Sequence, residues 1–318
     1  MKTSNDLDIA KVKLTYKNNY SQIQEVFLNV QSSFLAGIYD RYWKDLDSAN
    51  IVLFFAKNLH HEILRQKDLD LNHSVSFENF WKNHEMTKQN NCKIVDIANE
   101  TGLPKETARR KILTLIKNKT LSKSNEGLAW SPSLDQKKTY NNIIADELGQ
   151  ISKLIQLLAN TLELNISKDK IVNELKQNYS FYWFHYLKTQ LKYLNFWQKK
   201  IKDLELLLII IQCAIQASNE NIRESLQDKK KVQSKKAGDI SATSISEVTG
   251  IPRATCIRKL EKLLSLKLVK KNIDNKRYFY DNNLNNNSIN FKEINSKTID
   301  IFSEFYLIIL KSLNSEKR

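Results

Sequence analysis

The sequence predicts a mainly α-helical protein with small β hairpins, and three observations support this fold class. Only six glycines and three prolines occur among 318 residues, so few residues interrupt long helical patterns. Several long stretches place apolar residues three and four positions apart, as amphipathic helices do. A segment of fifteen residues occurs twice with little change, which indicates an internal duplication. We therefore expect two tandem helical copies, each with its own hairpin.

The repeated segment is "TGLPKETARRKILTL" at residues 101–115 and "TGIPRATCIRKLEKL" at residues 249–263. The two copies align without a gap at an offset of 148 residues, and seven of the fifteen positions are identical. A weaker similarity lies upstream, between residues 38–55 and residues 192–209. The expected duplication therefore extends beyond the fifteen-residue segment.

The first copy of the segment, with the residues just before it, predicts two short helices joined by a tight turn. Apolar residues at helical spacing in residues 94–100 suffice for the first helix. Gly102 can adopt a positive φ angle in the turn, and Pro104 suits the start of the second helix. The expected inward face of that second helix is Ala108, Ile112, Leu115 and Ile116, and its counterpart in the second copy is Cys256, Leu260, Leu263 and Leu264.

A hairpin pattern follows each second helix. Short strand-like segments flank the turns at residues 124–127 and at residues 272–276. A long amphipathic helix then closes each copy, at residues 141–164 and at residues 296–313.

Two domains follow from this pattern, related by a pseudo-twofold internal duplication. The first is expected at residues 1–165, with its helix-turn-helix and hairpin at about residues 92–133. The second is expected at residues 166–318, with the corresponding segment at about residues 240–281. Long helices would join the two copies and bury their apolar stripes between them.

The repeated segments resemble the winged helix-turn-helix domains of bacterial transcription regulators. "TGLPKETARRKI" and "TGIPRATCIRKL" are similar to the turn and recognition helix of regulators of the MarR, IclR and GntR types. The long helices around each copy most resemble a MarR-like architecture, although MarR-like proteins normally carry one such segment per chain. The resemblance implies two tandem winged helix-turn-helix domains, whose second helices enter the major groove of DNA and whose hairpins are small β wings.

The same resemblance implies which side chains contact DNA. On the two recognition helices they are Lys105, Thr107, Arg109, Arg110, Arg253, Thr255, Ile257 and Arg258. Arginine suits paired contacts with guanine or phosphate, threonine can donate to phosphate, and isoleucine can contact a thymine methyl group. On the second wing, Lys276 and Arg277 would contact the DNA backbone or the minor groove. The first wing, with Lys123 and Glu126, carries less positive charge and is expected to contact DNA less.

These features predict a sequence-specific regulator of transcription that binds double-stranded DNA as a single-chain pseudo-dimer. The net charge of +15 favours such a polyanionic partner. Glu106 and Arg109 of the first copy become Ala254 and Ile257 in the second, so we expect two unlike half-sites. The second interpretation is an origin-binding replication initiator with two winged helices. The third is a winged-helix scaffold for protein interactions. Further self-association and a small-molecule effector stay open.

No catalytic, cofactor or metal motif is present, so we do not expect an enzyme. The stretch "HHEILRQ" at residues 60–66 fails the zinc pattern HExxH because Arg65 stands at the second histidine position. We expect His60 and His61 to be surface or partly buried helix residues. Phosphate-binding GxxxxGK[ST], dinucleotide-binding GxGxxG and nucleophile GxSxG patterns are all missing.

The remaining stretches fit a cytoplasmic protein that does not enter a membrane. The polar start is no secretory signal, and the apolar stretch at residues 206–215, which follows Asp203 and Glu205, is too short to span a bilayer. The three cysteines, Cys92, Cys213 and Cys256, are far apart in sequence, which fits a reducing compartment.

Three further segments stand out by composition. The aromatic residues 179–197 are expected to pack in a helical core rather than to stack on bases or line a ligand pocket. Residues 228–239, which are basic, and residues 282–290, which are rich in asparagine, are expected to be loops.

Overall fold

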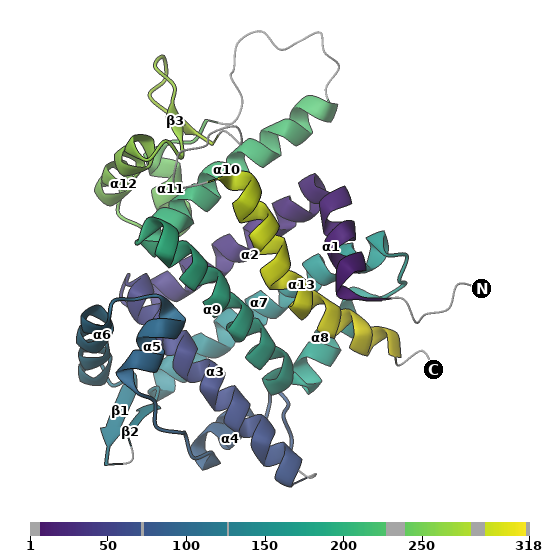
Figure 1. Cartoon of the computed structure of the whole chain (residues 1–318), viewed down its shortest axis with the longest axis vertical. Coiled ribbons are helices and arrows are strands. Elements are labelled where there is room, and N and C mark those ends of the chain that lie inside the picture. Colours follow the sequence, from purple (N-terminus) through teal and green to yellow (C-terminus); the bar gives the residue numbers. More distant parts are fainter. Residues whose placement is uncertain (1–6, 71–72, 126, 227–238, 281–289, 316–318) are drawn as a thin grey trace. The chain divides into compact units, whose positions relative to one another are not determined.

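The computed structural model describes residues 7–70, 73–125, 127–226, 239–280 and 290–315. Within these ranges the chain is mainly helical, with thirteen α-helices and two small antiparallel sheets of two strands each (Figure 1). The expectation of a mainly α fold with small β hairpins is thereby confirmed. The predicted loop at residues 228–239 lies outside the described residues except at its last residue, and the predicted loop at 282–290 does so likewise.

The chain folds into two compact units, and each unit combines segments that are far apart in sequence. The first unit consists of Met1–Asn18, Asp47–Lys199 and Thr298–Arg318, and the second consists of Asn19–Leu46 and Lys200–Lys297. Both units thus contain residues from either side of position 165, where the two expected domains meet. The units reflect packing, whereas the expected domains reflect the order of the repeats along the chain.

The first unit is built around long helices and one hairpin. Its elements are α1 (Ile9–Asn18), α3 (Leu46–Leu69), α4 (Phe80–Met86), α5 (Ile94–Thr101), α6 (Lys105–Lys117), β1 (Leu121–Ser124), β2 (Gly127–Trp130), α7 (Leu134–Thr161), α8 (Lys168–Gln177), α9 (Tyr179–Ile201) and most of α13 (Phe291–Ser315). Six aromatic side chains of α9 are buried, as expected for core packing: Tyr179, Tyr182, Trp183, Tyr186, Tyr193 and Trp197.

One expectation about this unit is wrong. His60 is fully buried, although the sequence suggested a surface or partly buried residue. Its ring stacks on Phe80 at a centroid distance of 4.7 Å and meets the edge of Tyr179 at 5.2 Å. Phe80 in turn contacts Tyr140 of α7, so His60 lies inside an aromatic cluster that joins four helices. His61, the next residue along α3, is exposed.

The second unit contains α2 (Tyr20–Arg41), α10 (Leu204–Leu226), α11 (Ala242–Thr249), α12 (Arg253–Ser265), β3 (Lys270–Lys271), β4 (Tyr278–Phe279) and the start of α13. Helix α10 packs against α2, and the two are joined by a buried hydrogen bond of 2.6 Å from Gln212 Nε2 to Ser32 Oγ. Ile240 pairs through its backbone with Tyr278, so the segment that leads into α11 is attached to the hairpin.

Candidate nucleic-acid interface

The turn between α5 and α6 is determined by Gly102 and braced by two long helices. Gly102 has a φ of 75°, the left-handed conformation that favours glycine, as the sequence predicted. Asn50 of α3 donates to the carbonyl oxygen of Thr101 at 3.0 Å. Asn195 of α9 donates to two carbonyl oxygens in the last turn of α5, at 2.7 and 2.8 Å. These bonds fix the turn and therefore the direction of α6 relative to α5.

Helix α6 has a buried apolar face and an exposed basic face. Ala108, Ile112 and Leu115 are buried and Ile116 is half-buried, which confirms the expected inward face. Among the expected DNA-contacting residues, Lys105, Arg109 and Arg110 are exposed and Thr107 is half-buried. The first turn of the helix, which follows directly on the tight turn, therefore offers its polar side chains to solvent.

The two arginines of α6 differ in their surroundings. Arg109 forms a paired contact with Glu106, with Nη2 2.7 Å from Oε1 and Nε 2.9 Å from Oε2. This contact lowers the pKa of the Glu106 carboxyl below its usual range. No side chain among the described residues forms an ion pair with Arg110, which leaves its guanidinium available for another acceptor.

The turn between α11 and α12 repeats this geometry. Gly250 has a φ of 71°, and its N–H donates to the carbonyl oxygen of Ser246 at 2.9 Å. Thr249 Oγ1 donates to the carbonyl oxygen of Ile245 at 2.7 Å and thus closes the end of α11. Pro252 precedes the first residue of α12, as Pro104 precedes α6.

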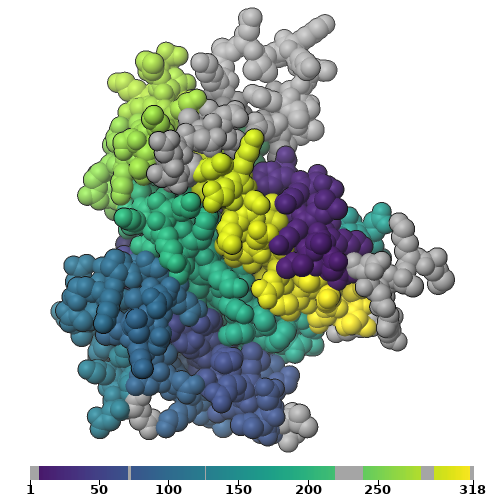
Figure 2. Space-filling view, in the orientation of Figure 1, coloured from purple at the N-terminus to yellow at the C-terminus, as the bar shows by residue number. Residues whose placement is uncertain are grey.

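Helix α12 likewise buries one face and exposes another. Cys256, Leu260 and Leu263 are buried and Leu264 is half-buried, again as expected. Of the expected contact residues, Arg253 and Arg258 are exposed, and Thr255 and Ile257 are half-buried. Arg253 Nε donates to Thr243 Oγ1 at 3.0 Å, whereas Arg258 pairs with no side chain in the described part of the chain. Figure 2 shows α6, in blue, and α12, in yellow-green, at the molecular surface.

One largely buried ion pair of α12 was not singled out from the sequence. The ammonium group of Lys259 lies 2.7 Å from Asp203 Oδ2 and 2.9 Å from Glu205 Oε2, and the residue is only 8% exposed. Asp203 also accepts hydrogen bonds from the backbone N–H groups at the start of α10. Lys259 therefore fastens α12 to the beginning of α10. The signal in the sequence is the acidic pair directly before the apolar stretch at residues 206–215.

The two hairpins differ in length and in the charge near their tips. In the first, β1 and β2 pair along four residues, and Lys123 is exposed, while Glu126 lies outside the described residues. In the second, two short strands enclose a loop at residues 272–277. Both expected contact residues of this wing, Lys276 and Arg277, are exposed.

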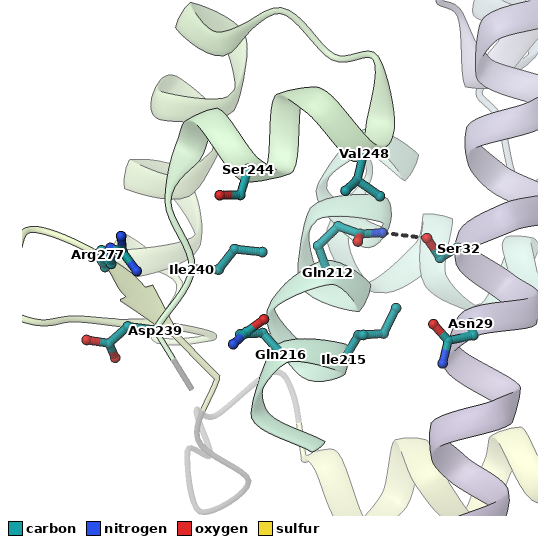
Figure 3. Close-up of a pocket in the computed structure, with 10 residues that line it drawn as sticks. All are labelled: Asn29, Ser32, Gln212, Ile215, Gln216, Asp239, Ile240, Ser244, Val248 and Arg277. Carbon is teal, nitrogen blue, oxygen red and sulfur yellow. Dashed lines mark hydrogen bonds between the residues drawn. The ribbon is translucent and has the colours of Figure 1, made fainter. Parts of the chain in front are cut away.

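A pocket of about 400 Å³ lies beside α11 in the second unit (Figure 3). Its walls come from α2, α10, α11 and the hairpin, and its lining is Asn29, Ser32, Gln212, Ile215, Gln216, Asp239, Ile240, Ser244, Val248 and Arg277. Arg277 thus borders the pocket as well as the hairpin loop.

The expected contact residues form two separate groups. Lys105, Thr107, Arg109 and Arg110 gather on α6 in the first unit; Arg253, Thr255, Ile257, Arg258, Lys276 and Arg277 gather on α12 and its hairpin in the second. Within the described ranges, no three His, Cys, Asp or Glu side chains lie close enough to hold a metal ion. None of the helices in these ranges has the length and apolar content needed to cross a bilayer.

Comparison with known proteins gives no relative: neither a family model, nor a curated protein, nor a solved structure matches the chain significantly.

Proposed function

We propose that this chain is a sequence-specific regulator of transcription that binds double-stranded DNA through α6 and α12. The observation that carries the proposal is the free guanidinium group on the outer face of each helix, Arg110 on α6 and Arg258 on α12. An arginine in the first turns of a helix reaches base edges and phosphates when that helix lies in the major groove. The buried face of each helix packs within its own unit, so each helix presents these side chains in a fixed direction relative to that unit.

The second part of the proposal is that the two helices act as an internally duplicated pair. Most helix-turn-helix proteins bind DNA as symmetric dimers, whose recognition helices meet the groove about one turn apart. A chain with two such helices can supply the pair as a single-chain pseudo-dimer. Arg109 is neutralised by Glu106 on α6, while α12 carries Ala254 and Ile257 at the aligned positions. The two half-sites should therefore differ in sequence.

Electrostatics favours the same partner. The net charge of +15 attracts a polyanion, and the exposed Lys276 and Arg277 add charge beside α12. Because such contacts release counterions from DNA, binding should weaken steeply as salt rises.

The test begins with selection of binding sites from a random duplex library by the full-length protein. We expect Arg110→Ala and Arg258→Ala each to weaken binding to the selected site by about tenfold or more, because each loses a base or phosphate contact of about 1–3 kcal/mol. Fluorescence anisotropy at several salt concentrations measures both the affinity and its salt dependence. Arg65→Ala is the matched control, since Arg65 is an exposed arginine on α3 and pairs with Glu62.

Footprinting then tests the pseudo-dimer. Arg110→Ala should lose protection over one half of the site and Arg258→Ala over the other half. Loss over the same half would contradict the paired arrangement, and wild-type affinity in both variants would contradict DNA binding through these helices. Protection of several tandem repeats would instead favour the origin-binding alternative.

A further inference from the structure

The tip of the second hairpin is an ordered loop at residues 272–277. The N–H of Asn272 donates to the carbonyl oxygen of Arg277 at 2.8 Å and closes the loop. Inside it, the N–H of Asp274 donates to Asn272 Oδ1 at 3.0 Å, and the N–H of Arg277 donates to Asn275 Oδ1 at 2.9 Å. Asparagine side chains commonly stabilise turns in this way.

A carboxylate below the loop holds it in place. The side-chain amides of Asn272 and Asn275 both donate to Asp239 Oδ2, each at 2.7 Å. Asp239 directly precedes Ile240, whose backbone pairs with Tyr278 of β4. The tip is therefore tied by hydrogen bonds to the base of its own hairpin.

This ordered loop presents an apolar side chain to water. Ile273 is 91% exposed, more than any other large apolar residue in the described part of the chain. Single exposed apolar residues are common on protein surfaces, but this one occupies the tip of a braced hairpin beside the exposed basic residues Lys276 and Arg277. Beside the turn of the first hairpin, Ser124 and Asn125 occupy the corresponding region.

We propose that Ile273 enters the minor groove of the bound duplex, wedges against a base step and bends the DNA there. This inference rests on the proposed function, since it assumes that α12 lies in the adjacent major groove. Apolar wedges, isoleucine among them, partly unstack base steps from the minor-groove side and kink the duplex. Lys276 and Arg277 would hold the phosphates next to the wedge. A flexible pyrimidine–purine step such as TA is the least costly place to kink, so one should recur in the selected site.

The experiment measures bending and affinity together on the selected duplex, labelled at its ends with a donor and an acceptor dye. Wild-type protein should shorten the distance between the ends. Ile273→Ala should bind about tenfold more weakly and leave the duplex nearly straight, because the smaller side chain cannot unstack the step. Ile273→Lys should keep or increase non-specific affinity through its added charge, yet also fail to bend the DNA. This second variant separates wedging from simple attraction.

Two controls make the result specific to the tip. Leu69→Ala removes an apolar side chain that is 89% exposed on α3, and it should change neither bending nor affinity. The thermal unfolding midpoint of Ile273→Ala should equal that of the wild type, because the side chain makes little contact in the free protein.

The outcomes distinguish the wedge from the proposed function. If Arg258→Ala loses binding while Ile273→Ala keeps wild-type affinity and bending, DNA binding stands and the wedge is wrong. A wild-type complex that leaves the duplex straight overturns the wedge as well. If no duplex is selected at all, both proposals fail.

Discussion

At the scale of single residues, neighbouring side chains of one type can have different surroundings, and local spacing explains part of the difference. Arg109 is paired with Glu106 three positions earlier, a contact that helical spacing makes possible and that the sequence alone would allow one to expect. Gly102 and Gly250 were also predictable, because a helix followed by glycine and proline favours a left-handed turn. The burial of His60 was not predictable, because it depends on Phe80 and Tyr179, which are distant in sequence.

The buried His60 should make the stability of the protein depend on pH. Burial disfavours the charged imidazolium and lowers the pKa of His60 to about 3 from its usual value of 6.5. Between these values the unfolded chain binds a proton that the folded chain does not, so stability falls as pH falls below about 6.5. From about pH 7.5 to pH 5 this one group should cost about 2 kcal/mol of unfolding free energy.

Replacement of His60 isolates this effect. His60→Phe keeps a ring between Phe80 and Tyr179 but cannot titrate, so urea unfolding at both pH values should show a smaller loss of stability on acidification. The buried Glu147 contributes with the opposite sign, since burial raises its pKa to about 8, and only the difference between variant and wild type is diagnostic. His61→Phe, at an exposed position, is the control. Equal acid sensitivity in His60→Phe and wild type would contradict the assignment.

At the scale of elements, periodicity predicted where helices lie better than where they begin. The helix expected at residues 141–164 is α7, which starts at Leu134 because Ser133 and Gln136 form a capping box. The helix expected at residues 296–313 is α13, which starts at Phe291, where Asn290 Oδ1 accepts hydrogen bonds from the first turn. Both starts carry fewer apolar residues than the helix body, so the apolar pattern alone could not locate them.

The attachment of α12 to α10 gives a prediction at this scale. Lys259→Met keeps most of the buried stem of the side chain but leaves Asp203 and Glu205 close together without a cation. Because the removal of one partner from a largely buried ion pair leaves the other charges uncompensated, the variant should lose about 2 kcal/mol of unfolding free energy. Urea unfolding monitored by circular dichroism measures the loss.

A second lysine provides the comparison. Lys271 pairs with Glu261 at 2.7 Å on the surface of the same unit, where solvent screens the interaction. Lys271→Met should therefore unfold nearly as the wild type does. If Lys259→Met were equally harmless, the contact with Asp203 and Glu205 would not hold α12, and the direction of α12 would have to depend on apolar packing alone.

At the scale of the whole molecule, the division into units could not be read from the order of the repeats. Helix α2, which comes early in the chain, packs in the second unit with α10, and Ser32 bonds to Gln212 across 180 positions. Helix α9, which comes late, supplies Asn195 to brace the end of α5 in the first unit. A similarity between two segments does not determine which flanking helix packs against which turn.

This interleaving predicts how the chain responds to being cut between the two expected domains. A fragment of residues 1–165 lacks α9 and α13 of the first unit, and a fragment of residues 166–318 lacks α2 of the second. Each fragment alone would expose the apolar faces that its missing helices cover, and should aggregate or unfold without a cooperative transition. When the two are co-expressed, they should assemble one to one and recover the circular dichroism and the cooperative unfolding of the intact chain. If each fragment instead unfolded cooperatively by itself, the two expected domains, and not the compact units, would fold independently. Helix α2 would then be dispensable for α11, which it contacts, and α9 for α5.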